Sequence, residues 1–247
     1  MSVMKLAHDN LLAPPETAAN ENAPEIAKHS GMRPRPLIRP ESLTYRRLVF
    51  AESGPLDAPL LGKAYECWSS VWRATLHELD NVTDVPSDEF TRQDEIGALF
   101  HDFECIGLSC VRWLDLENPI FRDDSYFKVW PADALRVASE YGSSACILSN
   151  LTVAPAFRRV PDLNVAEALL GLAMNRFEHS DADVLIGTPR ADRRVNQLAY
   201  RIGFCPIAPD VTLHGVKVDL VGYYRRTGMG ATLSPAVESV VNDLRLT

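Results

Sequence analysis

Two adjacent arginines separate a predicted buried strand from a predicted helix in the segment LTVAPAFRRVPDLNVAEALLGLAM (151–174). The first N–H groups of a helix have no acceptor within the helix, and the helix dipole adds about half a positive charge at that end. Together with Arg158 and Arg159, such a helix start predicts a site for a phosphate or pyrophosphate group.

The start of this helix also carries acidic residues. Asn164 and Glu167 have the spacing of a capping box, and Asp162 is a second candidate for the N-cap. The charges of Asp162 and Glu167 would repel a phosphate at close range. The alternative to an anion site is therefore an ordinary capped helix that follows a basic turn.

A second candidate for chemistry is Tyr200, in NQLAYRIGF (196–204). Apolar residues recur at helical spacing up to Gly203, which places Tyr200 on the last turn of a helix that leads into a strand. The alternative is purely structural. Gly203 and Phe204 would then be a C-cap and a core anchor, and Tyr200 a packed side chain with an exposed hydroxyl.

Hydrophobic periodicity predicts the elements that position these residues. Predicted strands span 43–51, 96–101, 105–114, 144–155 and 182–190, with two more within 205–226. Predicted helices span 60–79, 130–142, 164–179 and 195–202, with a last helix capped by Ser234. Gly142 is expected to be a helix C-cap. This order predicts one α/β domain with a mixed sheet, over residues 41–247.

Residues 1–40 differ from the rest of the chain. They carry prolines at positions 14, 15, 24, 34, 36 and 40 and show little apolar periodicity. We expect them to form a mobile or loosely docked N-terminal arm.

Composition excludes several classes of protein. The formal net charge of −8 argues against general nucleic-acid binding, which needs a basic face. The sequence has no apolar run long enough to span a membrane and no secretory signal. Its five cysteines include no C-x-x-C pair, which predicts free thiols, a cytoplasmic protein and no zinc or other metal site. A local cluster of basic residues indicates one anionic ligand or partner, or simply a solvated surface: Arg158, Arg159, Arg190, Arg193 and Arg194.

Two motifs resemble those of a known superfamily. V-A-P-x-F-R-R (153–159) and N-x-x-A-Y-x-x-G-F (196–204), joined by an apolar helix and a strand, are similar to the acyl-CoA-binding core of the GNAT N-acyltransferases. Residues 43–226 follow the element order of that superfamily. The resemblance implies a GNAT-like α/β fold, in which helices flank a central mixed, mostly antiparallel sheet.

The front half is similar to one subgroup, the N-acyl amino acid synthases and acyl-homoserine-lactone synthases. The similarity lies in VWRATLHELDNVTD (71–84) and GLSCVRW (107–113). The residues that match the subgroup's recurrent charged positions are Arg73, Asp80, Asp84 and Arg112. The resemblance implies that Arg73, Asp80 and Arg112 bind the acceptor substrate.

The resemblance also implies a mechanism. An acyl thioester, carried on coenzyme A or on the phosphopantetheine of an acyl carrier protein, would lie between two splayed central strands. A neutral amine would attack it, and Tyr200 would protonate the departing thiolate. The residues expected to bind the donor are Leu151, Val153, Arg158, Arg159, Asn164, Val165, Ala166 and Asn196.

The chain departs from the superfamily pattern at two places. Asn164 and Ala166 replace the glycines of the pyrophosphate turn, which favours a carrier protein with a single phosphodiester over free coenzyme A. Ile147 and Asn150 replace a glutamate and an arginine of the subgroup, so the usual base is absent. The remaining candidates for the base are Glu104, His101 and Asp80. We expect Glu104 to be a catalytic residue together with Tyr200.

The leading interpretation is an enzyme that transfers an acyl group to the amine of an amino-acid-like small molecule. The missing glycines and base favour a different class, a catalytically inactive module that binds an acyl thioester or a protein partner. Synthesis of a signal lactone from S-adenosylmethionine ranks lower, because nothing specifies an adenosine pocket. A plain acetyltransferase is the remaining alternative.

Overall fold

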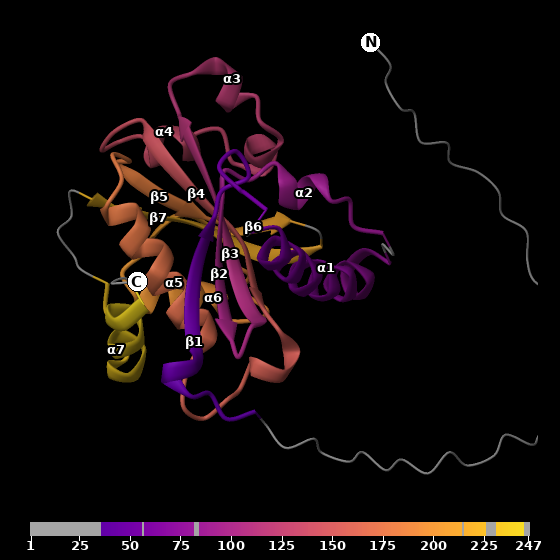
Figure 1. Cartoon of the computed structure of the whole chain (residues 1–247). Helices are drawn as coiled ribbons and strands as arrows, with labels where there is room; N and C mark the ends of the chain where they lie inside the picture. Colours follow the sequence, from indigo (N-terminus) through magenta and orange to yellow (C-terminus); the bar gives the residue numbers. More distant parts are fainter. Residues whose placement is uncertain (1–35, 56, 82–83, 214, 226–230, 245–247) are drawn as a thin grey trace, which may run out of the picture. The chain divides into compact units, whose positions relative to one another are not determined.

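The computed structural model describes residues 36–55, 57–81, 84–213, 215–225 and 231–244 (Figure 1). Most of the N-terminal arm expected at 1–40 therefore lies outside the described residues. Within the described part, packing begins at Ile38, which is buried in a cluster with Leu43 and residues of two helices.

A seven-stranded sheet forms the centre of the domain. Its strands are β1 (Leu43–Leu48), β2 (Glu95–His101), β3 (Glu104–Asp115), β4 (Ser144–Val153), β5 (Val184–Gly187), β6 (Cys205–Leu213) and β7 (Val216–Tyr224). Their order is β1-β2-β3-β4-β5-β7-β6. Only β4 and β5 are parallel, and every other neighbouring pair is antiparallel. The predicted mixed, mostly antiparallel sheet is thus confirmed.

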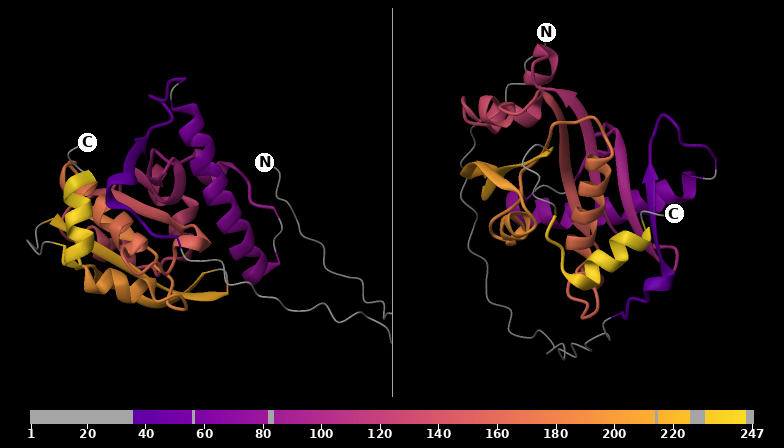
Figure 2. Two further views of the ribbon diagram at one scale, coloured as in Figure 1. Left: turned by 60° about the horizontal axis from the view of Figure 1, so that its bottom comes forward. Right: turned by 90° about the vertical axis from the view of Figure 1, so that its left-hand side faces the viewer.

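Helices cover both faces of the sheet (Figure 2). The α-helices are α1 (Ala58–Asp80), α2 (Asp88–Thr91), α3 (Pro119–Arg122), α4 (Ala134–Ala138), α5 (Val165–Glu178), α6 (Val195–Arg201) and α7 (Pro235–Leu244). Short 3-10 turns span Pro40–Ser42, Ser125–Val129 and Pro155–Phe157. Helices α5, α6 and α7 pack on one face, whereas α1, α2 and α4 pack on the other.

One predicted helix is shorter than expected. The helix predicted at 130–142 is α4, which ends at Ala138 with Ser139 as its C-cap. Gly142 is therefore not the C-cap, although its φ of 148° is one that other residues rarely adopt. A Cβ at Gly142 would overlap the carboxyl group of Asp183, which accepts a hydrogen bond from the Ser144 N–H. Glycine is needed there for close packing before β4.

The two central strands separate after a short parallel contact. Residues 145–148 of β4 pair with 184–187 of β5. After β5 the chain stays with β7, where the carbonyl of Pro189 accepts a hydrogen bond of 3.1 Å from the N–H of Asp219. Residues 149–153 of β4 stay with β3 instead. Because backbone groups alternate between the two sides of a strand, this part of β4 turns N–H and C=O groups toward a side on which no strand of the described residues pairs with it.

A β-bulge lies in β4 where the separation begins. Cys110 of β3 pairs with Ser149, and Leu108 pairs with Thr152, so two residues of β4 face one of β3. Asn150 has a φ of 53°, in the left-handed region that asparagine tolerates better than most residues. The Thr152 hydroxyl donates to the Asn150 carbonyl (2.7 Å) and accepts from the indole nitrogen of Trp72 (3.0 Å). Helix α1, which carries Trp72, therefore supports the bulge from the opposite face.

An ion pair fixes the C-terminal end of α5 to the sheet. Arg176 donates two hydrogen bonds, of 2.9 and 2.7 Å, to the Glu95 carboxylate of β2. The Arg176 guanidinium lies 4.8 Å from the ring centre of Trp113, whose indole nitrogen also donates to Glu95. Glu95 is only 7% exposed. This end of α5 is thus held by a largely buried charge pair.

Substitution Glu95→Ala is expected to lower the free energy of unfolding by about 2 kcal/mol, because Arg176 would lose its carboxylate partner while remaining half-buried. Urea unfolding followed by circular dichroism measures this. Arg92→Ala, which breaks an exposed ion pair with Glu89, is the control and is expected to change stability by about 0.5 kcal/mol or less. Equal effects of the two substitutions would contradict the structural role of the Glu95 pair.

Candidate functional site

The start of α5 follows the turn that contains the two arginines. Asn164 is the N-cap, and its side-chain oxygen accepts a hydrogen bond of 3.2 Å from the Glu167 N–H. This confirms the predicted pairing of Asn164 with Glu167 and leaves Asp162 exposed in the preceding turn. The N–H groups of Val165 and Ala166 lie at the first turn of the helix and have no acceptor within it.

Glu167 is an anion built into this end of the helix. It is 2% exposed, and its carboxylate accepts hydrogen bonds from the Asn164 amide (3.3 Å), the Arg201 guanidinium (2.9 Å) and the Ser234 N–H (2.6 Å). The Glu167 charge is therefore bound by groups of α6 and of the segment before α7. That pairing reduces its repulsion of a ligand at the helix start.

The basic cluster predicted from the sequence is divided in the structure. Arg158 is exposed, and its Nε donates to the Val153 carbonyl at the end of β4 (3.1 Å). Arg159 is also exposed, on the same turn. Arg190 and Arg193 instead pair with carboxylates, Arg190 with that of Asp192 and Arg193 mainly with that of Glu78 on α1. Of these four arginines, Arg158 and Arg159 lie on the turn that leads to α5.

A buried carboxylate that the sequence analysis missed lies behind Tyr200. The Tyr200 hydroxyl donates a hydrogen bond of 2.7 Å to Oδ2 of Asp219 on β7, and the Asn196 amide donates to the same oxygen (2.9 Å). Oδ1 of Asp219 accepts from the N–H of Asp210 (2.9 Å). The sequence does carry a sign of this carboxylate, because Asp219 is the one acidic residue in the mostly apolar strand VKVDLVGYY (216–224). An aspartate in such a strand is expected to be buried and hydrogen-bonded.

These contacts shift the pKa values of Tyr200 and Asp219 in opposite directions. Burial, followed by the hydrogen bond to Asp219 and its charge, raises the pKa of Tyr200 well above its ordinary value. For Asp219, burial raises the pKa, but the hydrogen bonds from Tyr200, Asn196 and the Asp210 N–H outweigh it, so the pKa is lowered. The resting pair is therefore a neutral phenol that donates to a carboxylate.

The residues of β4 predicted to bind the donor lie where the strand leaves β5. Leu151 and Val153 are half-buried and belong to the segment that, among the described strands, pairs with β3 alone. Leu151, like Tyr200, packs against the hydrophobic cluster between the sheet and helices α5 and α6. The structure thus brings Leu151, Tyr200 and the α5 start to one side of the sheet.

The predicted acceptor-binding residues are dispersed. Arg112 lies on β3 and forms a half-buried ion pair with Asp124 (2.8 Å), and its hydrogen bond lowers the pKa of Asp124. Arg73 and Asp84 are exposed. Asp80 is the last residue of α1, and its side chain lies outside the described part.

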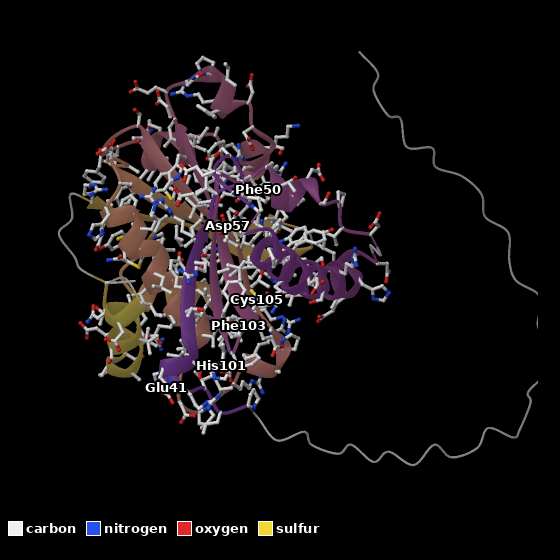
Figure 3. The ribbon with its side chains drawn as sticks, in the orientation of Figure 1. Glu41, Phe50, Asp57, His101, Phe103 and Cys105 are labelled. Carbon is white, nitrogen blue, oxygen red and sulfur yellow. The ribbon has the colours of Figure 1, made fainter. Side chains whose placement is uncertain are left out.

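The candidate bases Glu104 and His101 pair with each other at the turn of the β2–β3 hairpin. His101 and Phe103 of this turn are labelled in Figure 3. Glu104 is exposed, and it takes no part in the hydrogen bonds described for Tyr200, Asp219 and the α5 start. His101 is 8% exposed, and its Nε2 accepts a hydrogen bond of 3.2 Å from the Arg39 N–H. His101 therefore anchors the segment before β1.

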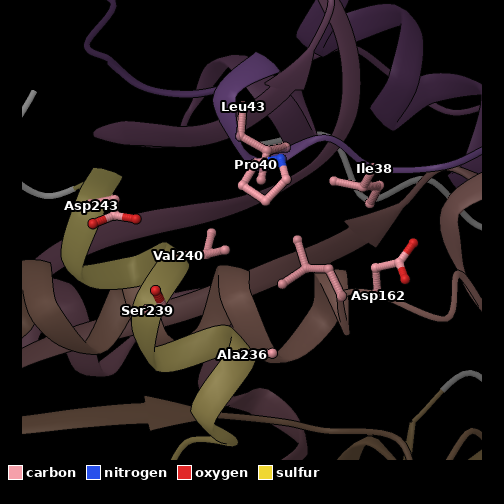
Figure 4. A pocket seen from close by; sticks show the side chains of 9 residues that line it. Ile38, Pro40, Leu43, Asp162, Ala236, Ser239, Val240 and Asp243 are labelled. Carbon is pink, nitrogen blue, oxygen red and sulfur yellow. The ribbon is translucent and has the colours of Figure 1, made fainter.

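A cavity of about 240 Å³ lies between the start of β1, the turn before α5 and α7 (Figure 4). Its lining is mostly apolar but includes the carboxylates of Asp162 and Asp243. These charges make it unsuitable for a phosphate.

Within the described ranges, no group of three His, Cys, Asp or Glu side chains is placed to hold a metal ion. All five cysteines are free thiols. None of the helices in the described part is both long enough and apolar enough to cross a membrane.

Comparison with known proteins shows the fold. No protein-family profile and no curated sequence matches the chain. Among solved structures, a mosquito arylalkylamine N-acetyltransferase-like protein is 13% identical, with 74% of this chain and all of that one covered, at a TM-score of 0.55. The chain thus has the α/β fold of GNAT N-acyltransferases.

Two further matches have TM-scores below 0.5. The N-acyl amino acid synthase FeeM from uncultured soil microbes is 12% identical, with 83% of this chain and 98% of that one covered, at 0.49. The acyl-homoserine-lactone synthase LasI is 10% identical, with 81% and 95% covered, at 0.48. These two matches identify no subgroup for this chain.

The bulge at Asn150 gives a stability test of the site. Asn150→Val is expected to lower the free energy of unfolding by about 1–3 kcal/mol, because a β-branched residue is strained at positive φ. Asn150→Gly, which relieves that strain, is the matched control and is expected to cost less. Urea unfolding distinguishes them, and a valine variant as stable as the glycine variant would contradict the observed bulge.

Proposed function

We propose that this protein is an N-acyltransferase that moves an acyl group from a phosphopantetheine thioester to the amine of an amino-acid-like small molecule. The observation that carries the proposal is the separation of β4 from β5 beside the free start of α5. An extended pantetheine arm fits such an opening, because its amides can pair with the strand groups that β5 leaves without a partner.

The charges at the turn support a donor with a single phosphodiester. The N–H groups of Val165 and Ala166 and the exposed Arg158 and Arg159 offer donors to one phosphate group. The buried Glu167 occupies the inner side of the same helix end. An acyl carrier protein, which presents one phosphodiester on an acidic surface, matches this turn better than the full nucleotide of coenzyme A does.

Arg112 is the residue we assign to the acceptor. A guanidinium has five N–H donors, and one of them bonds to Asp124, so Arg112 keeps donors for a substrate carboxylate. The pair also places a carboxylate, that of Asp124, where it can attract a substrate ammonium group. This combination suits an amino-acid-like acceptor.

The alternative is an inactive module that binds an acyl thioester or a protein partner. The Arg158 side chain bonds to the Val153 carbonyl, a group that a pantetheine amide would otherwise use. The turn also lacks the glycines that permit close approach to a pyrophosphate. Both features favour binding without turnover, and the two functions are separated by measuring thiol release.

The purified protein, given acyl-carrier and acyl-CoA donors with mixed amino acids, is expected to release free thiol. Tyr200→Phe should lower kcat by about 10²–10⁴-fold, because the variant has no hydroxyl to transfer a proton. Tyr223→Phe is the matched control, since that hydroxyl bonds to Glu178 and is not expected to contact the donor. Thiol release is followed with a chromogenic disulfide.

Full activity of Tyr200→Phe would remove Tyr200 from the mechanism. Donor binding by the wild type without any thiol release would instead favour the inactive module.

Donor class is tested with Arg159→Ala. We expect kcat/KM for an acyl carrier protein donor to fall by about tenfold, because the exposed turn loses a charge that would attract the acidic carrier. Arg46→Ala, an exposed substitution on β1, serves as the control and should leave the rate unchanged. A wild-type kcat/KM higher for acyl-CoA than for the carrier donor would contradict the assignment of the carrier.

A further inference from the structure

Asp219 lies beside the opening between the central strands. Its N–H bonds to the Pro189 carbonyl, at the point where the chain after β5 has already left β4. Its side chain is directed to the face that holds α6, where it receives the hydrogen bonds of Tyr200 and Asn196. A buried carboxylate thus stands directly behind the hydroxyl group assigned to the reaction.

The direction of the hydrogen bond decides what Tyr200 offers to a ligand. Because the phenolic proton is directed to Asp219, the lone pairs of the oxygen are left for another donor. An amine N–H is such a donor. In the resting protein the pair is therefore arranged to accept a proton.

The charged groups around this pair are few. Asp210 of β6 contributes its N–H to Asp219, and its carboxylate further raises the pKa of Tyr200. Lys217 of β7 directs its ammonium group to the Asp210 carbonyl. Arg190, before α6, is held by Asp192. None of these described contacts gives Asp219 a cationic partner, so its carboxylate remains able to take a proton.

We propose that Asp219 acts through Tyr200 as the proton acceptor that the sequence lacks at its usual position, and that it also fixes the direction of the Tyr200 hydroxyl. The inference rests on the proposed acyl transfer. It assigns Asp219 as a positioning residue, since Tyr200 alone of the two would touch the substrate.

The proposed step balances in atoms and electrons. The amine nitrogen forms a bond to the thioester carbon and gives one proton to the Tyr200 oxygen, while the phenolic proton passes to Oδ2 of Asp219. The carbon–sulfur bond then breaks, and its electron pair leaves on sulfur. The proton returns from Asp219 through Tyr200 to the sulfur, so the products are an amide and a thiol, and the pair regains its resting state.

The first test measures the pair without reference to activity. Protein labelled with ¹³C at the tyrosine ζ carbon is titrated by NMR, and the Tyr200 signal is assigned by its loss in Tyr200→Phe. In the wild type this signal is expected to stay that of a neutral phenol well beyond the ordinary pKa of about 10. Titration of Tyr200 near that ordinary value would overturn the proposal, and this arm needs no substitution of Asp219.

Asp219→Asn keeps the shape of the side chain and an acceptor for the Tyr200 hydroxyl but removes the charge. We expect the pKa of Tyr200 to fall by about one unit or more in this variant. Glu178→Gln is the matched control, because burial and then Glu178 raise the pKa of Tyr223, which lies on the same strand as Asp219, to about 12. That variant should change the pKa of Tyr223 and leave the pKa of Tyr200 unchanged. An unchanged Tyr200 titration in folded Asp219→Asn would overturn the proposal.

The second test is kinetic. Asp219→Asn should lower kcat by about 10²-fold, with the KM values of donor and acceptor changed by about threefold or less. Added to Tyr200→Phe, it should cause no further loss, because Asp219 acts only through Tyr200. A wild-type kcat in Asp219→Asn would overturn this role alone. Absence of thiol release from the wild type would overturn the proposed function and, with it, this role.

Discussion

The site depends on one constraint, which is that the neighbouring strands β4 and β5 each continue their hydrogen bonding with a different partner. β4 remains paired with β3 to its last residue, whereas the chain after β5 remains paired with β7. The two strands therefore share only a short parallel contact and must then diverge. The N–H and C=O groups that would pair between the strands of a continuous sheet are therefore available to a ligand. The ligand can bind to these backbone groups without needing side chains for the same purpose.

Several contacts maintain this divergence. The bulge at Asn150 bends β4 at the start of its free segment, and Trp72 holds Thr152 from the opposite face. β-Bulges bend a strand and are common next to active sites. Because α5 is held at one end by Glu95 and at the other by the contacts of Glu167, its start keeps a defined position beside the opening.

The electrostatics of the site come mainly from internal pairing. Glu167 is bound by Arg201, Arg112 pairs with Asp124, and Asp219 receives three neutral donors. A buried carboxylate is tolerated only when hydrogen bonds replace its water, and each of these pairs meets that condition. Within the part of the chain that the structure describes, the Asp219 carboxylate thus receives hydrogen bonds from neutral donors but forms no ion pair.

The sequence by itself determined the α/β class, the element order and the capped start of α5, because these follow from local periodicity and from the spacing of Asn164 and Glu167. It also singled out Tyr200. Only the tertiary structure decided that Asp219 bonds to Tyr200 and that Arg201 bonds to Glu167. Such pairings join residues whose separation in sequence carries no local signal, since they are set by strand order and by which face each side chain occupies.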